Sequence, residues 1–520
     1  MTLSFGPFTK FFMHPLFHSL QNRKAYLLKG TFLLGAAGIL CKIAGFFYKI
    51  FLSRTIGAQE IGLFHLCLPL CTLCVTFSGG GIATILSRLA AQYTAQKESK
   101  KEQCFLLASL LGSLLLSLFC SFLLYYNAAF LAQRLLKNDA CTPLLCILSL
   151  TFPLAALHAC ISGYFIGKKQ VAVPALSQLF EQFFRIASVL FFYILFLRAE
   201  KKPDSTVMAL GQLSGELSAG LFCLFFLFLK TPFPQKMPFL TIPRGIAEVL
   251  RLSAPLNLSR VVLCLFQAAE AALLPLLLIR SGMTDSDALA LYGVLSGMVL
   301  PLLLFPTVFT SSVSTLLLPV VSEAHTLGHF GKIQTAVRTS LSGGLLLGLY
   351  FFALFFLYGG ELGTLLFSSS SAGMCIRRFS FLCPLLYANT ILIGILHGLG
   401  KTAVVSLQSM LSLALRLVLL LILIPQLGLS GYLLAVLSGQ SVSFLLALLT
   451  LFRIGSLPHD FLQTLPRLLL ACAVTICGGL VLRNWLGFAS GQWINLLTES
   501  TICSALFFSA YVSLRKSTDR

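Results

Sequence analysis

Long apolar stretches separated by short polar or charged breaks fill most of this 520-residue sequence. Stretches such as 106–124 and 341–357 approach the ~20 apolar residues that a membrane-spanning helix needs, and they contain no charge. Counting such stretches predicts about fourteen spans, near 30–53, 60–86, 104–126, 141–166, 171–197, 206–229, 248–279, 288–321, 336–358, 378–398, 403–425, 429–452, 465–483 and 494–514.

Two of these spans are longer than a simple crossing requires. The second span contains Gly79-Gly80-Gly81, and the eighth contains Pro301 and Pro306. Glycine runs and prolines interrupt regular helices, so we expect both spans to be tilted or broken at these positions.

The composition supports the prediction of membrane-spanning helices. Hydrophobic residues make up 57% of the chain, charged residues make up 10%, and the mean hydropathy is +0.91. A soluble domain could not bury so much apolar surface. The predicted fold class is therefore an all-α integral membrane protein of about fourteen transmembrane helices.

An internal repeat organises the predicted spans. The fourth and fifth spans match the tenth and eleventh at an offset of 231 in the numbering, and the sixth matches the twelfth at an offset of 224. Pro, Gly and intramembrane Arg are rarer than Leu, so their joint recurrence predicts two pseudo-symmetric six-helix lobes in the same orientation, followed by two C-terminal helices. The matching positions are Ser149/Ser380, Pro153/Pro384, Leu154/Leu385, Gly163/Gly394, Gly167/Gly398, Ala172/Ala403, Val173/Val404, Leu176/Leu407, Arg185/Arg416 and Leu213-Ser214-Gly215-Glu216/Leu437-Ser438-Gly439-Gln440.

The repeat and the breaks divide the chain into segments. The aromatic and basic segment 1–29 lacks the apolar core of a cleavable signal, so we expect it to lie at the cytoplasmic interface. The predicted segments are the N-terminal segment 1–29, a first lobe 30–229, a cytoplasmic loop 230–247, a second lobe 248–453, two further helices within 465–514 and a cytoplasmic tail 515–520.

The excess of Lys and Arg over Asp and Glu predicts how the chain is oriented in the membrane. Lys and Arg number 37 against 17 Asp and Glu, a net charge of +20, and basic loops of membrane proteins stay cytoplasmic. This rule predicts a multi-pass cell-membrane protein with both termini in the cytoplasm, and the external cluster Arg198, Lys201 and Lys202 fits it least well. Nucleic acid is not an expected partner, because the basic residues form no contiguous patch.

No catalytic residue, metal site or cofactor is expected. The 16 Cys residues are scattered, and Cys71 and Cys74 form a C-x-x-C inside a span without a second pair or a nearby His at ligand spacing. No loop presents paired carboxylates, a Ser/His/Asp set, an H-E-x-x-H motif or a Walker A motif. The sequence therefore predicts a transporter, not an enzyme, driven by an ion gradient, the membrane potential or downstream consumption of product.

The first span carries a basic stripe. Gly35, Gly38, Lys42, Gly45 and Lys49 recur at spacings of three and four, which places them on one helix face. An intramembrane Lys usually faces a wet cavity or a partner, so Lys42 and Lys49 are candidate substrate-binding residues of a cationic cavity. The alternative is that Lys49 snorkels to the outer interface and Lys42 pairs with a carboxylate elsewhere.

The fifth span carries an expected ion pair. Glu181 and Arg185 lie one turn apart and can pair, either as a structural pair or as part of a gate. The repeat places Ser412 where Arg416 would need its acid. Arg416 therefore needs another counter-charge, a lipid headgroup or the substrate, and it joins the candidate substrate-binding residues.

The seventh span adds a second polar face. Asn257, Arg260, Gln267 and Glu270 occupy roughly one half of its surface. We expect Arg260 to converge with Lys42 and Lys49 at the interface of the lobes, where repeat transporters bind substrate.

Two carboxylates are candidate coupling residues, Glu216 and Glu270. Glu216 could bind a proton or cation, or could only complete polar packing with Ser214. The isolated His65, His158 and His397 are expected to be hydrogen-bonded packing residues.

The N-terminal part of the chain resembles the stage V sporulation protein B family, and the likeness is most specific over 29–92. The matching elements are Lys29-Gly30-Thr31, Gly45-Phe46-Phe47-Tyr48-Lys49, Ser53-Arg54, Ile56-Gly57-Ala58, Ile61-Gly62-Leu63-Phe64, Gly80-Gly81-Ile82-Ala83, Ser87-Arg88-Leu89 and Gly163-Tyr164-Phe165 with Gly167 and Gln170. The resemblance implies membership of the multidrug/oligosaccharidyl-lipid/polysaccharide exporter superfamily, with two six-helix lobes around a central cavity.

Relatives in that superfamily include lipid II flippases of the MurJ type. By this resemblance Lys42 matches a cationic cavity position, whereas Lys49 is shifted by one residue from the next such position. The second-helix cationic pair of those flippases has no counterpart, because Phe77, Ser78 and Gly79 stand there.

The resemblance implies a flippase for a polyprenyl-diphosphate-linked cell-wall precursor, such as lipid II, in peptidoglycan or spore-cortex synthesis. Its expected partners are the lipid-linked oligosaccharide, membrane lipids and cell-wall synthesis proteins. The alternatives are a flippase of a lipid-linked exopolysaccharide unit, a cation-coupled multidrug exporter and a non-transporting scaffold. Cation-coupled multidrug exporters of this superfamily usually have a carboxylate in the first helix, where this chain has lysines.

Overall fold

The computed structural model describes residues 25–231, 241–456, 461–486 and 493–516. The expected interfacial segment up to residue 24, the middle of the inter-lobe loop and the tail beyond residue 516 lie outside these residues. The described residues form two compact units. The N-terminal unit comprises 25–276 and Thr284–Gly293, and the C-terminal unit comprises Leu277–Met283 and 294–516.

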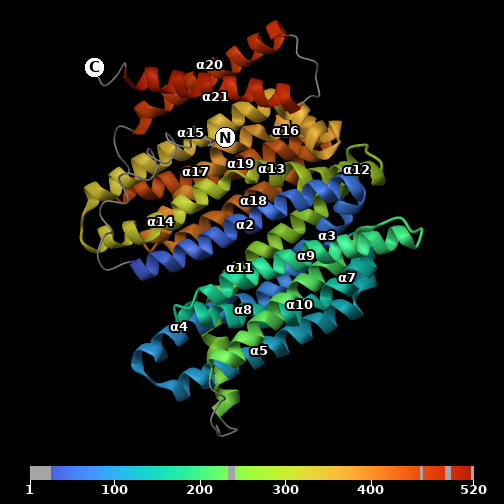
Figure 1. The fold of residues 1–520 in the computed structure, drawn as a ribbon, viewed down its shortest axis with the longest axis vertical. Coiled ribbons are helices and arrows are strands. Elements are labelled where there is room, and N and C mark those ends of the chain that lie inside the picture. The colour runs from blue at the N-terminus through green and yellow to red at the C-terminus, as the bar shows by residue number, and fades with distance from the viewer. Residues whose placement is uncertain (1–24, 232–240, 457–460, 487–492, 517–520) are drawn as a thin grey trace. The chain divides into compact units, whose positions relative to one another are not determined.

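The N-terminal unit is built from helices, drawn from blue to green in Figure 1. Three of its elements, α3, η1 and α4, are consecutive segments of one interrupted span, and α7 and α8 divide another. The elements are α2 (Ala25–Thr55), α3 (Ala58–Val75), η1 (Thr76–Gly80), α4 (Gly81–Gln96), α5 (Ser99–Tyr126), α6 (Ala128–Phe130), η2 (Leu131–Leu135), α7 (Cys141–Ser149), α8 (Thr151–Gly167), α9 (Ala172–Arg198), α10 (Ser205–Lys230), α11 (Thr241–Arg280, as far as Leu276) and α12 (Asp285–Gly293).

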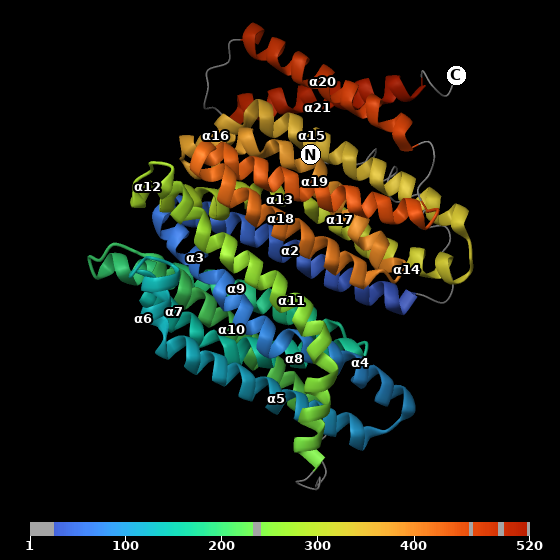
Figure 2. The ribbon, with the colours of Figure 1, turned by 180° about the vertical axis from the view of Figure 1, so that it is seen from behind.

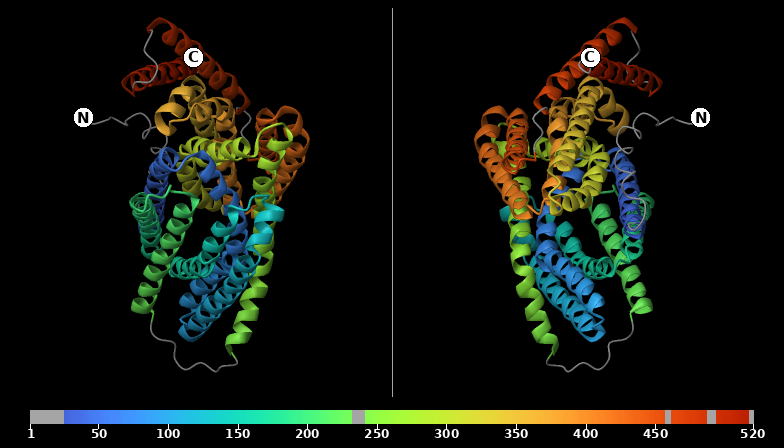
Figure 3. Two further views of the ribbon diagram at one scale, coloured as in Figure 1. Left: turned by 90° about the vertical axis from the view of Figure 1, so that its right-hand side faces the viewer. Right: turned by 90° about the vertical axis from the view of Figure 1, so that its left-hand side faces the viewer.

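The C-terminal unit is helical as well. Its last two helices, drawn in red, pack against each other and against α15 (Figure 2 and Figure 3). The elements are η3 (Val294–Val299), α13 (Leu300–Leu304), α14 (Thr307–Thr326), α15 (Phe330–Phe367), α16 (Ser370–Phe379), η4 (Ser380–Leu382), α17 (Cys383–Gly398), α18 (Thr402–Leu427), α19 (Leu429–Arg453), α20 (Phe461–Leu486) and α21 (Trp493–Lys516).

The predicted fold class is confirmed. Thirteen helical segments of the described chain are long and apolar enough to cross a membrane, and α20 contains a shorter apolar stretch over Pro466–Val481. Every span expected from the sequence coincides with one helix or with up to four consecutive segments, and the expected eighth span falls on two membrane-spanning candidates, Asp285–Leu304 and Thr307–Thr326. The chain is a multi-pass membrane protein.

Both expected interruptions are present. The second span changes from α-helix to the π-helical segment η1 before α4 begins at Gly81. The eighth span passes from α12 through the π-helical η3 into α13, and α14 begins only after Pro306. A π-helical turn leaves backbone carbonyls without their usual partners, so these segments need polar neighbours.

The repeat recurs in the close contacts of each unit. In the N-terminal unit, a Cβ on Gly163 of α8 would lie 2.5 Å from the carbonyl oxygen of Ala83 on α4. In the C-terminal unit, a Cβ on Gly394 of α17 would lie 3.0 Å from the Cα of Ser314 on α14. Gly394 lies 231 positions after Gly163, and Ser314 lies 231 positions after Ala83. The predicted internal repeat therefore extends to individual helix contacts.

The next helical turn repeats the same contact. Gly167 faces the carbonyl of Ser87, and Gly398 faces the carbonyl of Leu318, again at an offset of 231. Glycine at these positions lets the two backbones of each helix pair approach closely, as small residues do in membrane helix packing.

We predict that Gly163→Ala and Gly394→Ala each destabilise the protein, by roughly 1–3 kcal/mol, because the added methyl overlaps the facing helix. The matched control is Gly360→Ala in α15, where an added Cβ meets nothing within 4 Å. Thermal unfolding in detergent should show a lower midpoint for the first two variants and an unchanged or higher one for the control. Equal midpoints for all three would contradict the packing role of these glycines.

Candidate transport site

The basic stripe of α2 faces α9. Cys41 donates from Sγ to the carbonyl of Gln178 at 3.4 Å, and a Cβ on Gly45 would lie 3.5 Å from Nε2 of Gln182. The rings of Phe51 and Tyr193 meet edge to face, with their centroids 5.5 Å apart. Of the glycines of this stripe, Gly45 lies against α9, whereas a Cβ on Gly35 or Gly38 would meet nothing within 4 Å.

The two lysines of the basic stripe differ in their surroundings. Lys42 is exposed in the chain, whereas Lys49 is half-buried and its charge interacts with that of Arg185 on α9. Glu181 already contacts Arg185, so a further anion in this region would act on the charge of Lys49. This arrangement suits an anionic ligand.

The expected pair of α9 is present. Arg185 Nη2 contacts Glu181 Oε1, and Arg185 Nη1 donates to Gln182 Oε1 at 3.3 Å. About a fifth of each charged side chain is exposed, 21% for Arg185 and 20% for Glu181, so the pair is largely shielded. Its role as a gate stays a prediction.

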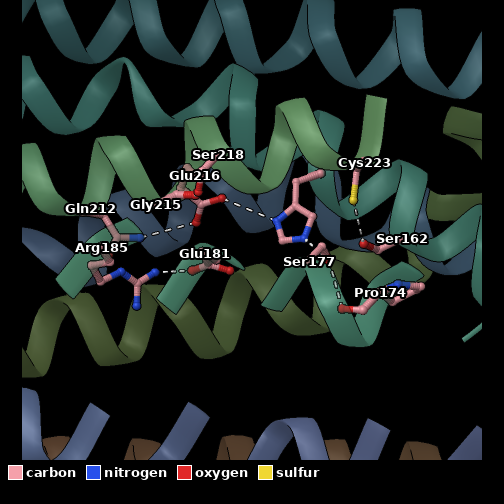
Figure 4. A network of polar contacts seen from close by, with 11 residues as sticks. Ser162, Pro174, Ser177, Glu181, Arg185, Gln212, Gly215, Glu216, Ser218 and Cys223 are labelled. Atoms are coloured by element: carbon pink, nitrogen blue, oxygen red, sulfur yellow. Dashed lines mark hydrogen bonds and ion pairs between the residues drawn. The ribbon is translucent and has the colours of Figure 1, made fainter. Parts of the chain in front are cut away.

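A histidine of α8 joins this polar region, in which Glu181 and Arg185 lie beside Glu216 (Figure 4). His158 Nδ1 lies 3.6 Å from Glu216 Oε2 on α10, and its Nε2 lies 3.0 Å from Ser177 Oγ on α9. Gln212 donates to Glu216 Oε1 at 3.4 Å. The hydrogen bond expected of His158 is thus present, but the spacing of the sequence does not indicate that His158 faces Glu216, because the two residues lie on different helices.

The C-terminal unit holds a neutral counterpart of this pair. Asn389 follows His158 at the offset of 231, and Gln440 follows Glu216 at the offset of 224. Asn389 Nδ2 donates to Gln440 Oε1 at 2.9 Å and to the Gln440 carbonyl at 3.1 Å. The repeat therefore keeps the contact but replaces both titratable groups with amides.

Arg416, the counterpart of Arg185, finds an aromatic neighbour. It donates to the hydroxyl of Tyr432 at 3.2 Å, and its guanidinium lies 5.8 Å from the centre of that ring. Ser412, in the position of the missing acid, donates to the Gly439 carbonyl at 2.7 Å. Arg416 belongs to the C-terminal unit, whereas Lys42, Lys49 and Arg260 belong to the N-terminal one.

The polar face of α11 lies on the π-helical segment. Arg260 Nη1 donates to the carbonyl of Gly80 at 2.9 Å and lies 3.3 Å from Thr84 Oγ1, while Asn257 Nδ2 approaches the Phe77 carbonyl at 3.4 Å. These donors serve carbonyls of η1, as the freed groups require. The contacts of Arg260 therefore lie with the first helices of the chain, although counting spans places it in the second lobe. Glu270, further along α11, is buried.

A second polar network was not indicated by the sequence. Glu102 on α5 accepts from Tyr164 at 2.6 Å, from Lys168 at 2.8 Å and from Thr94 at 3.1 Å. Burial opposes the charge of Lys168, but its hydrogen bonds to Glu102 and Tyr164 outweigh burial and raise its pKa. This network joins α4, α5 and α8.

Its counterpart in the C-terminal unit is apolar. The offset of 231 carries Glu102, Tyr164 and Lys168 onto three apolar positions. These are Ile333, Ile395 and Leu399, which are buried together in one hydrophobic cluster. Equivalent helices thus pack with a polar network in one unit and with apolar side chains in the other. We therefore interpret the Glu102 network as part of the helix packing.

Comparisons with known proteins agree with these features. A family model for polysaccharide biosynthesis proteins matches residues 27–325. Stage V sporulation protein B of Bacillus subtilis (strain 168) is 26% identical over 492 residues, which cover 93% of this chain and 94% of that protein. Lipid II flippase MurJ of the same organism is 21% identical over 490 residues, 89% of each chain.

A solved structure shares the fold. The lipid II flippase MurJ in an inward closed conformation superposes with a TM-score of 0.71 at 15% identity, over 94% of this chain and 100% of that chain. The resemblance to the stage V sporulation protein B family is thereby confirmed. Because the family model covers more than half of its residues, the chain belongs to the polysaccharide biosynthesis protein family.

Proposed function

We propose that this protein is a flippase that carries a polyprenyl-diphosphate-linked cell-wall precursor, similar to lipid II, across the cell membrane by alternating access. The relatives named stage V sporulation protein B and lipid II flippase MurJ support a transporter of this class. The proposed organisation is that expected from the sequence, a first lobe over 30–229 and a second over 248–453, and the proposed partners are membrane lipids and cell-wall synthesis proteins.

The observation that carries the proposal is the charge of the first helix. α2 contains Lys42 and Lys49 within its apolar length and no Asp or Glu. The head of such a precursor carries a diphosphate, which cannot cross hydrocarbon unaided and which Lys and Arg side chains bind by charge-assisted hydrogen bonds. Its lipid tail can stay in the bilayer while the head passes.

The substrate-binding residues of the proposal are Lys42, Lys49, Arg260 and Arg416. Glu181 and Arg185, which are paired on α9, act as a gate or as the structural support of a gate. Glu270 is a candidate for coupling transport to an ion gradient. An inside-negative potential favours outward passage of an anion by about 2.3 kcal/mol per charge per 100 mV.

The alternative within this class is a lipid-linked exopolysaccharide unit, whose diphosphate head presents the same chemistry. A cation-coupled multidrug exporter is a weaker alternative, because a basic stripe repels cationic drugs. Competition between unlabelled lipid II, an exopolysaccharide lipid and ethidium would separate the three.

We predict that Lys42→Ala slows flipping of fluorescent lipid II in proteoliposomes by roughly tenfold or more, because one charge-assisted contact to phosphate is lost. Lys42→Arg should retain most of the rate. The matched control is Lys101→Ala, which removes an exposed cation of the first turn of α5 that pairs with the neighbouring Glu98. If wild type flips and Lys42→Ala flips equally fast in a folded state, Lys42 does not bind the head group.

The proposed orientation places both termini in the cytoplasm. A fluorescent protein fused after residue 520 should therefore fluoresce, and an alkaline phosphatase fused there should be inactive. Active phosphatase at this position would overturn the orientation and exchange the two sides of every loop.

A further inference from the structure

Three titratable side chains of the N-terminal unit meet between α8, α9 and α10. One donor or acceptor atom from each of His158, Glu181 and Glu216 lies within 4.8 Å of the others. Among the described residues this is the one place where three His, Cys, Asp or Glu side chains gather so closely. The side chains of His158 and Glu216 are only 13% and 14% exposed.

The charges within this group do not balance. Among these three side chains and Arg185, two carboxylates face one guanidinium, so a neutral imidazole leaves one negative charge in excess before Lys49 of α2, which interacts with Arg185, is counted. An uncompensated charge inside a membrane protein is costly. Uptake of one proton would balance the group.

The first helices of the chain bring further titratable groups toward α9 and α10. From α2, Lys49 interacts with Arg185, and Cys41 interacts with Glu181 and Arg185. From α3, Glu60 accepts a hydrogen bond from the Ser205 backbone at the start of α10.

Charged and titratable side chains also occur on α3, α4 and α5. His65 of α3 interacts with Lys49. Glu102 of α5 is held by Lys168, Arg88 lies on α4, and α7 contains no Asp, Glu, Lys, Arg or His.

The position of the imidazole suits a proton. Its Nε2 is held by Ser177 at 3.0 Å, which leaves Nδ1 directed at Glu216 at 3.6 Å. A proton on Nδ1 would turn this contact into an ion pair without moving a helix.

The internal repeat places an equivalent of the His158–Glu216 contact in the C-terminal unit. In the C-terminal unit the equivalent pair, Asn389 and Gln440, makes a hydrogen bond of 2.9 Å between groups that do not titrate. Ser412 takes the place of Glu181 there. The helix packing is therefore satisfied by neutral amides, and the titratable groups of the N-terminal unit need another reason.

We propose that His158, Glu216 and Glu181 form a proton-binding site that takes up one proton from water and shares it between His158 Nδ1 and Glu216. Loading and release of this proton would couple transport to a proton gradient, a role that rests on the proposed function. A metal ion suits the group less well, because Arg185 already contacts Glu181 and would repel it.

The test is infrared difference spectroscopy of the full chain in nanodiscs between about pH 5 and about pH 8, which spans the usual titration of His. Wild type should show protonation bands of imidazole or carboxyl. The double variant His158→Asn/Glu216→Gln copies the neutral pair of the C-terminal unit, so it should fold and lose the part of these bands that belongs to one proton, while the seven other His and the other carboxyls of the chain keep their share. Glu102→Gln, a buried carboxyl outside the site, is the matched control and should keep them.

Three results would overturn the proposal. The bands of wild type and the double variant are equal in strength, Glu102→Gln loses as much as the double variant, or sodium chloride abolishes the difference between wild type and the double variant at constant pH where choline chloride does not, which would assign a metal ion. If the double variant fails to fold, Glu216→Gln alone is used with the same criteria. Because the spectra need no substrate, they decide the proton site even if lipid II proves not to be carried.

In proteoliposomes without a membrane potential, an imposed pH gradient should alter wild-type flipping at least twofold and leave the folded double variant unaffected. A wild-type rate that ignores the gradient would overturn the coupling role. Absence of flipping at any gradient, with the infrared bands intact, would overturn the proposed function and leave the proton site standing.

Discussion

Hydrocarbon offers no hydrogen-bond partners, so each polar group at membrane depth must find its partner within the chain. The contacts of the π-helical segment η1 follow from this constraint, because Asn257 and Arg260 of α11 serve the carbonyls of Phe77 and Gly80. The Glu102 network and the neutral pair of Asn389 and Gln440 satisfy the same requirement. These partners let irregular and polar segments exist within long apolar helices.

The two units meet the constraint with the same contacts and different chemistry. Facing glycines, at Gly163 and Gly394, bring equivalent helix pairs together in both units. Yet the N-terminal unit carries Glu102 where the C-terminal unit carries buried Ile333, and His158 where it carries Asn389. The contacts shared by the two units therefore need neither Glu102 nor His158, since apolar or amide side chains take their places in the C-terminal unit.

The helices, their interruptions and the repeat follow from the sequence, because hydrophobic length, Pro and Gly act locally. The Glu181–Arg185 pair is predictable for the same reason, since the two residues lie one turn apart. The contact of His158 with Glu216 and the position of Arg260 beside Gly80 are not, because they join helices that are distant in sequence. The offset of 231 could have pointed to the first, since Asn389 and Gln440 mark the same place.

The central claim is that this protein carries an anionic lipid head across the membrane. The most direct measurement is the rate of lipid II flipping by the wild-type protein in proteoliposomes under opposite membrane potentials of equal size. We expect faster passage toward the positive side, since each head-group charge gains about 2.3 kcal/mol per 100 mV. Flipping that ignores the sign of the potential, or no flipping of any diphosphate-linked lipid, would contradict it.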